Sequence, residues 1–195
     1  MEAIDTRTMI IIGAAVIAVL LIIAVVVMER KRRSTRLKER FGAEYDQVLL
    51  QQGDVRHAEA VLAEREKRVE KFSIRSLSKA DRDRYLADWA NVQRRFVDDP
   101  ALAVNEADTL VTMVMSTRGY PMSDFEQRAA DISVHYPRVV QNYRSARLIV
   151  VRHGQGQATT EELRQAMVYY RSLFEELLDA PATEKIGVTH ERIAS

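Results

Sequence analysis

The fold is decided by residues 99–118, DPALAVNEADTLVTMVMSTR, which predict a buried central helix. Asp99 before Pro100 is a typical helix start, because aspartate caps free backbone N–H groups and proline fits the first helical turn. Apolar side chains then recur on most sides of the helix, so little polar surface remains for water. They are Leu102, Ala103, Ala107, Leu110, Val111, Val114 and Met115. We therefore expect the neighbouring helices to pack around this one.

Beyond the loop at residues 118–121, the sequence predicts three further helical segments. Ser123 and Glu126 have the spacing of a capping box for the first segment. Pro137 begins the second segment, because proline is favoured in a first turn. Within the second segment, residues 147–151 are rich in β-branched side chains and fit either a helix or a short strand.

The third of these segments has the clearest helical pattern. Thr159 and Glu162 suit a capping box, and apolar side chains follow at steps of three and four. They are Leu163, Ala166, Tyr170, Leu173 and Leu177. From Pro181 the sequence becomes polar and aperiodic, so we expect residues 181–195 to form a flexible tail.

Upstream of residue 99, an aromatic face predicts another helix. Ser78 and Asp81 suit the start of a helix, and large side chains follow at helical spacing. They are Tyr85, Trp89, Val92 and Phe96. We expect this face to belong to the core and Trp89 to be buried, with the lining of a ligand pocket as the alternative.

Residues 43–72 predict two shorter helices separated by Gly53. The second contains residues 64–71, which are nearly all charged, so we expect much of that helix to face water. Helices joined by short loops, with no glycine-rich turn from strand to helix, indicate an all-α fold. The sequence thus predicts a compact multi-helix bundle over residues 42–180.

The most apolar part of the chain is residues 9–28, MIIIGAAVIAVLLIIAVVVM, which predict an N-terminal transmembrane helix. Its 20 residues carry no charged or hydrogen-bonding side chain, and as a helix they extend about 30 Å, the thickness of the bilayer's hydrocarbon core. A cleaved signal peptide has a shorter apolar core, basic residues before it and a small-residue cleavage site after it. These features are absent or reversed here, so we expect a retained anchor.

Basic residues in the segment 29–41 set the predicted orientation of the anchor. One Lys or Arg lies in residues 1–8, against seven between residues 29 and 40. The formal net charge is +1, yet from Phe41 onward there are 21 basic against 24 acidic residues, so the positive excess lies beside the anchor. The positive-inside bias then places residues 1–8 outside the cell and the bundle in the cytoplasm.

The same basic segment predicts contact with anionic lipid headgroups. Nucleic-acid binding is the weaker interpretation, because no aromatic side chains are interleaved for base stacking. The side chains expected to contact lipid are Arg30, Lys31, Arg32, Arg33, Arg36 and Lys38.

Composition and spacing exclude most catalytic chemistries. The chain has no cysteine, which rules out disulfides, thiolate metal sites and cysteine nucleophiles. Its four histidines lie in different segments, without the paired spacing of a zinc-binding helix. The string Arg152-His153-Gly154 looks like the signature of the histidine phosphatases, but the later residues of that α/β domain do not follow it. We therefore expect no catalytic residue, no cofactor and no metal.

Three stretches after the anchor are distinctive: RGYP at residues 118–121, DFEQRAAD at residues 124–131 and ELRQAM at residues 162–167. Together they resemble a family of uncharacterised bacterial proteins with a single N-terminal membrane anchor. The resemblance extends over most of the region after the anchor and implies a bacterial inner-membrane setting and a self-contained domain. It implies no activity, substrate or catalytic residue.

These expectations indicate a membrane-tethered cytoplasmic helical module that interacts with or scaffolds another protein. The alternative is an enzyme or a small-ligand-binding domain with a pocket between helices. The candidate partner contact is the loop Gly119, Tyr120 and Pro121, because loops often carry recognition and tyrosine is a favoured interface residue. The other interpretation is that Tyr120 folds back over the following helix. The expected partners are the lipid bilayer and a second protein, and no nucleic acid.

Overall fold

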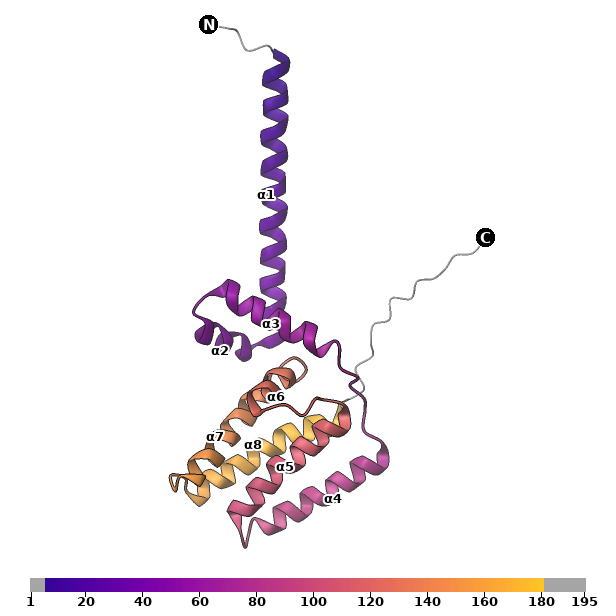
Figure 1. Cartoon of the computed structure of the whole chain (residues 1–195), viewed down its shortest axis with the longest axis vertical. Coiled ribbons are helices and arrows are strands. Elements are labelled where there is room, and N and C mark those ends of the chain that lie inside the picture. Colours follow the sequence, from indigo (N-terminus) through magenta and orange to yellow (C-terminus); the bar gives the residue numbers. More distant parts are fainter. Residues whose placement is uncertain (1–5, 181–195) are drawn as a thin grey trace, which may run out of the picture. The chain divides into compact units, whose positions relative to one another are not determined.

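The computed structural model describes the backbone of residues 6–180, and the side chains from residue 15 onward. Every regular element in this part of the chain is an α-helix, which confirms the predicted all-α fold class (Figure 1). Residues 1–5 and the predicted tail at residues 181–195 lie outside the described range. The described helices are α1 (Thr6–Phe41), α2 (Ala43–Gln52), α3 (Val55–Val69), α4 (Lys79–Arg95), α5 (Pro100–Arg118), α6 (Phe125–Ile132), α7 (Val140–Gly154) and α8 (Thr160–Asp179).

The chain divides into two compact units, Met1–Arg40 and Phe41–Ser195. The described part of the first unit belongs to helix α1, which runs without interruption from Thr6 to Phe41. Its described apolar side chains, from Val16 to Met28, are all exposed. Because they point in every direction around the helix axis, α1 has no buried apolar stripe along this stretch.

Within the range that the structure describes, no helix is both long and apolar enough to cross a membrane. The predicted transmembrane segment, residues 9–28, begins with residues 9–14, whose side chains lie outside the described range. The assignment of residues 9–28 as a transmembrane helix stays a prediction.

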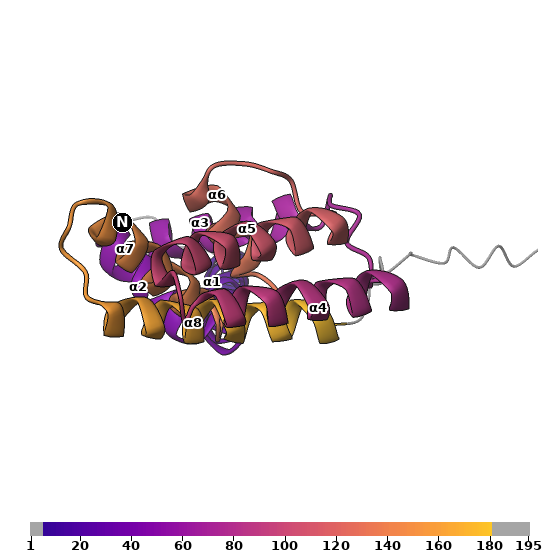
Figure 2. The ribbon, with the colours of Figure 1, turned by 90° about the horizontal axis from the view of Figure 1, so that it is seen from below.

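In the second unit, α4, α5, α7 and α8 form an apolar bundle (Figures 1 and 2). Helix α5 packs against α4, α7 and α8, and α8 packs in turn against α7. The predicted central helix is confirmed, since α5 buries eight side chains between Ala103 and Arg118. The predicted burial of Trp89 is confirmed as well, because this side chain is 6% exposed.

Helix α5 ends in a buried arginine that is bound to the end of α8. Arg118 is 1% exposed, and its Nη1 donates hydrogen bonds to the carbonyl oxygens of Leu177 (2.7 Å) and Ala180 (2.9 Å). Carbonyl groups in the last turn of a helix lack intrahelical donors, so this guanidinium satisfies acceptors that α8 cannot satisfy itself. Gly119 follows in the left-handed region, at φ +99°, and caps α5.

Helices α2 and α3 form a hairpin that joins the bundle through a buried carboxylate. Glu44 of α2 is fully buried, and it accepts a hydrogen bond from Arg65 of α3 (2.6 Å). Arg144 of α7 donates to both oxygens of the same carboxylate, and Gln141 of α7 donates to one of them at 2.8 Å. Two guanidinium groups around one carboxylate supply the charge pairing that a buried anion requires.

The prediction that much of the helix containing residues 64–71 faces water is confirmed in part, since Glu64, Lys67, Glu70 and Lys71 are exposed whereas the other side chains of this run are not. Glu66 is 6% exposed, and the Arg65 side chain is 13% exposed. Arg68 donates from Nε to Asp131 of α6 at 3.0 Å, and Asp131 is itself 1% exposed. Arg65 and Arg68 are partly covered because Glu44 of α2 and Asp131 of α6 supply oppositely charged partners, which the local charge pattern does not reveal.

Most predicted helix starts are confirmed. Ser78, Asp99 and Thr159 each accept a backbone N–H bond in the first turn, and Thr159 forms the full capping box with Glu162. The capping box predicted at Ser123 is wrong, because the next residue, Asp124, accepts from the backbone N–H of Gln127 instead. A carboxylate at this position also interacts favourably with the helix dipole. Residues 147–151 are helical and belong to α7.

Candidate functional site

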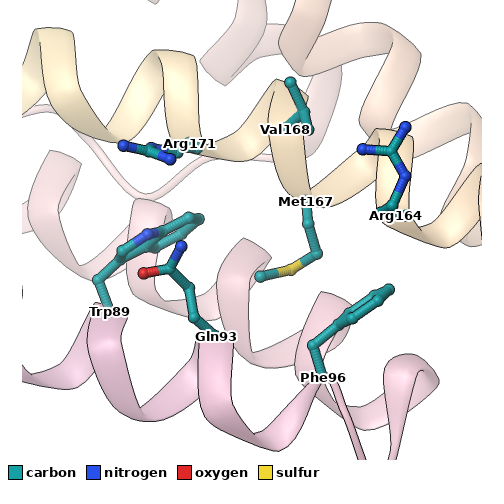
Figure 3. A pocket seen from close by; sticks show the side chains of 7 residues that line it. All are labelled: Trp89, Gln93, Phe96, Arg164, Met167, Val168 and Arg171. Carbon is teal, nitrogen blue, oxygen red and sulfur yellow. The ribbon is translucent and has the colours of Figure 1, made fainter.

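An apolar groove lies between α4 and α8 (Figure 3). The two helices run antiparallel, since Arg82 near the start of α4 pairs with Asp179 at the end of α8 at 2.5 Å. Further along α4, the Trp89 ring stacks on Phe174 with the ring centroids 4.7 Å apart. The groove opens beyond this stacked pair, toward the end of α4.

Aromatic and aliphatic side chains line the groove. Figure 3 shows Met167 extending from α8 between Trp89 and Phe96 of α4. Trp89 and Met167 are buried, whereas Val168, which also lines the groove, is 47% exposed. The groove has a volume of about 190 Å³. Sites for drug-sized ligands occupy roughly 300–1,000 Å³, so this groove suits a smaller group, such as one large apolar side chain.

Two arginines of α8 flank the groove. Arg164 and Arg171 are seven residues apart, which is two helical turns or about 10.5 Å. Each one pairs with a carboxylate of its own helix, Arg164 with Glu161 at 2.6 Å and Arg171 with Glu175 at 2.7 Å. The hydrogen bonds from Arg164 lower the pKa of Glu161. All four side chains are more than half exposed. Exposed ion pairs within one helix are weak, so both arginines can exchange these carboxylates for those of another molecule.

The indole of Trp89 carries a buried N–H that has no hydrogen-bond acceptor. The exposed Gln93 side chain lies beside the ring (Figure 3). Leaving a buried donor without an acceptor costs about 1–3 kcal/mol. A ligand that brings an acceptor into the groove would recover part of that free energy.

The surface of α4 has opposite charges on its two sides. Next to the groove, a more open hollow shares Gln93 and is lined by Ala87, Ala90, Asn91, Arg94 and Val97. Neither of these two hollows has an acidic side chain among its described lining residues. By contrast, the groove between α4 and α5 contains Asp88 and Glu106. The charged side chains that line the hollows on the two sides of α4 therefore differ, although Glu106 on the second side pairs with Arg95 of α4 at 2.6 Å.

The predicted partner contact, Gly119, Tyr120 and Pro121, lies in the connection from α5 to α6. Tyr120 is 3% exposed, and its hydroxyl group shares a hydrogen bond with Nδ1 of His135 at 2.7 Å. Burial raises the pKa of this hydroxyl. These contacts favour the interpretation that the Tyr120 ring packs inward. Gly119 is partly exposed and Pro121 is exposed, and their contact with a partner stays a prediction.

The side chains predicted to contact lipid all lie on α1 and are exposed. Arg32 also lies 3.9 Å from Glu29, one turn earlier. The contact of these side chains with anionic lipid stays a prediction. They are Arg30, Lys31, Arg32, Arg33, Arg36 and Lys38.

No group of three or more His, Asp or Glu side chains placed to hold a metal ion occurs in the described part of the chain. His190 lies outside that part. The string Arg152-His153-Gly154 forms the end of α7, where Arg152 pairs with Glu162 of α8 at 2.7 Å. This string therefore ends a helix, whereas the corresponding string of the histidine phosphatases ends a strand.

Sequence reasoning identifies the α4 side of the groove and misses the α8 side. The predicted aromatic face supplies Trp89 and Phe96, and Trp89 belongs to the core and lines the groove at the same time. On α8 the sequence predicts an apolar stripe, which does not contain Arg164 or Arg171. Arginines seven residues apart on a helix surface are common. Only the position of α4 beside α8 shows that these two flank a groove.

Comparison with known proteins found no matching family model, no matching curated protein and no matching solved structure. The resemblance to a family of membrane-anchored bacterial proteins stays a prediction.

Proposed function

We propose that the chain is a membrane-tethered helical module that binds another protein through the groove between α4 and α8. The observation that carries this proposal is the groove itself, with its apolar lining, its two flanking arginines and an indole N–H that lacks an acceptor. An exposed apolar surface rimmed by polar residues is typical of an interaction site.

The membrane part of the proposal rests on the sequence of α1. Residues 9–28 contain no charged side chain, and the described apolar side chains of this stretch are exposed all around the helix. In a bilayer these side chains would contact lipid. Six of the seven basic residues that follow, from Arg30 to Lys38, would meet anionic headgroups, with the N-terminus outside and the bundle in the cytoplasm, at a bacterial inner membrane.

A protein partner fits the groove better than the alternative function, an enzyme or a small-ligand-binding domain. The volume of about 190 Å³ leaves room for one large side chain and is below that of a typical small-molecule site. Interfaces between proteins often place one apolar anchor residue into such a depression and surround it with charged residues.

Affinity capture of the full chain from its native membrane tests the groove as an interface. Val168→Glu puts a charge on the rim of the groove, so we expect the partner to be lost. The matched control is Leu148→Glu, which changes an apolar side chain of α7 that is 60% exposed and does not line the groove. If both variants melt like the wild type and both still recover the partner, the groove is not the interface.

Cysteine labelling tests the orientation, since the chain has no cysteine of its own. A single cysteine introduced at Ser195 should be protected from a membrane-impermeant thiol reagent in intact cells. Replacing Arg30, Lys31, Arg32 and Arg33 with glutamine should increase labelling from outside, because the charge bias that fixes the orientation is reduced. Complete labelling of the otherwise unchanged chain from outside would contradict the cytoplasmic assignment.

A further inference from the structure

We infer that the groove between α4 and α8 binds an acidic amphipathic helix of a partner protein, which inserts an apolar side chain and presents carboxylates to Arg164 and Arg171. This inference rests on the proposed function and specifies the kind of partner.

The positions of the two arginines define the spacing of the partner's residues. Arg164 and Arg171 are two turns apart on α8, and Met167 and Val168 lie between them. A partner helix that packs along α8 at the shallow crossing angle of coiled coils, about 20°, keeps its register with α8 over two turns. Its acidic residues would therefore be seven positions apart, with apolar residues at the third and fourth positions after the first acid. The pattern is acidic-x-x-apolar-apolar-x-x-acidic.

The charges around the groove favour an acidic helix over a basic one. The described lining of the groove and of the adjoining hollow contains Arg94, Arg164 and Arg171 and no carboxylate. Carboxylates of a partner can replace Glu161 and Glu175 in the exposed pairs of α8, because such pairs are weak. A basic helix would instead meet like charges. Charge complementarity of this kind selects among partners.

The Trp89 indole supplies a further point of recognition and a direct readout. Its buried N–H has no acceptor, and the neighbouring Gln93 side chain is exposed. An acceptor on the inserted segment would then satisfy this N–H. Trp89 is the single tryptophan of the chain, so fluorescence excited selectively at tryptophan reports on the groove alone.

The test uses the full chain in neutral detergent and two synthetic helical peptides without tryptophan. The acidic peptide has glutamates seven positions apart, with leucines at the third and fourth positions after the first glutamate. The control peptide has lysines in place of the glutamates. We expect saturable changes in Trp89 fluorescence with the acidic peptide, weakening as salt is added, and no binding of the lysine peptide.

Variants of the chain decide whether the arginines provide the selectivity. The double change Arg164→Gln and Arg171→Gln should weaken binding of the acidic peptide about tenfold. The matched control is Arg84→Gln, which removes a similar exposed pair with Asp81 on α4, away from the groove, and should leave binding unchanged.

Three results would overturn the inference: no fluorescence response to the acidic peptide, equal binding of the lysine peptide, or full binding by the double variant. The proposed function has its own criterion, the loss of the native partner in Val168→Glu. If Val168→Glu loses the native partner but the chain binds the acidic and the lysine peptide equally well, the inference fails and the proposed function stands. If Val168→Glu keeps the partner, the proposed function fails.

Discussion

Glu44 is a single side chain that holds three helices together. Its fully buried carboxylate pairs with Arg65 of α3 and Arg144 of α7, whose side chains are 13% and 17% exposed. Glu44→Ala would leave two largely buried guanidinium groups without a counter-charge, so we expect the free energy of unfolding to fall by about 3–5 kcal/mol. Urea unfolding followed by circular dichroism measures this loss.

A control for this change lies on the same helix. Asp46 is exposed on α2, and Asp46→Ala should alter the free energy of unfolding by less than about 1 kcal/mol. If Glu44→Ala and Asp46→Ala unfolded at the same urea concentration, the buried charge network would contribute nothing to holding α2 and α3 on the bundle.

Four of the six buried tyrosines should make the second unit sensitive to alkali. Burial raises the pKa of Tyr120, Tyr136, Tyr143 and Tyr170 above the ordinary value of 10.0. In the unfolded chain each phenol loses its proton near pH 10.0, whereas in the folded chain it keeps the proton. The folded state therefore binds more protons above that pH. Its stability is complete below pH 10.0 and falls as the pH rises, by up to about 1.4 kcal/mol per pH unit for each group.

An alkaline titration followed by phenolate absorbance and circular dichroism tests this expectation. Of the seven tyrosines, we expect these four to ionise only as the helical signal disappears. Tyr170→Phe removes one such group and should make the decline of stability with pH less steep. Ionisation of all seven tyrosines near pH 10 with the helical signal intact would contradict the prediction.

At the scale of the helices, two left-handed glycine caps differ in their surroundings. Gly53 ends α2 at φ +70°, with nothing within 4 Å of the place a Cβ would occupy. Gly119 ends α5 at φ +99°, where a Cβ would lie 2.4 Å from the carbonyl oxygen of Ser73. Gly53→Ala should cost about 1 kcal/mol through backbone strain alone. Gly119→Ala should cost clearly more, because the backbone at Ser73 must also move.

Thermal melting of the two glycine variants measures the difference. The backbone around Ser73 is fixed on the end of α5, since the N–H of Arg75 donates to the carbonyl of Arg118 at 2.9 Å. Displacing Ser73 should therefore disturb this contact as well. Equal melting temperatures for Gly53→Ala and Gly119→Ala would show that the close approach at Ser73 is relieved without cost.

Local patterns predict the helices well because the forces that begin a helix are local. The caps at Ser78 and Thr159 act within one turn, and the all-round apolar pattern of α5 requires burial whatever its neighbours are. Whether the charged side chains of residues 64–71 are exposed or covered depends on partners far away in the sequence. Arg68 and Asp131 are 63 residues apart, so no local pattern could show that this face of α3 is covered.

Only the α4 side of the candidate site could be predicted, because local spacing shows which side chains share a helix face but not which helix packs against that face. Helical spacing placed Trp89 and Phe96 on one face, but whether that face was sealed or left open depended on how α8 lies against α4. The flanking residues Arg164 and Arg171 acquire their role only through that packing. For Tyr120, the sequence leaves both partner contact and inward packing open, and the hydrogen bond to His135 that favours inward packing comes from the tertiary fold.

At the scale of the whole molecule, the second unit contains its own apolar core and should fold without the first. We expect a fragment of residues 41–180 to give a helix-dominated circular dichroism spectrum and to unfold cooperatively. Its melting temperature should not change when a chelator is added. A β-rich spectrum or melting that depends on a chelator would contradict the predicted all-α, metal-free domain.

The contacts of the buried Arg118 also limit how early this domain can fold while it is being synthesised. Its two acceptor carbonyls, on Leu177 and Ala180, lie 59 and 62 residues further along the chain. A ribosome adding about 5–20 residues per second needs roughly 3–12 s to make that stretch. During those seconds the nascent α5 has no α8 to cover its apolar surface or to accept from its guanidinium. The bundle therefore closes only after α8 has emerged, and a chaperone that shields α5 has that interval in which to act.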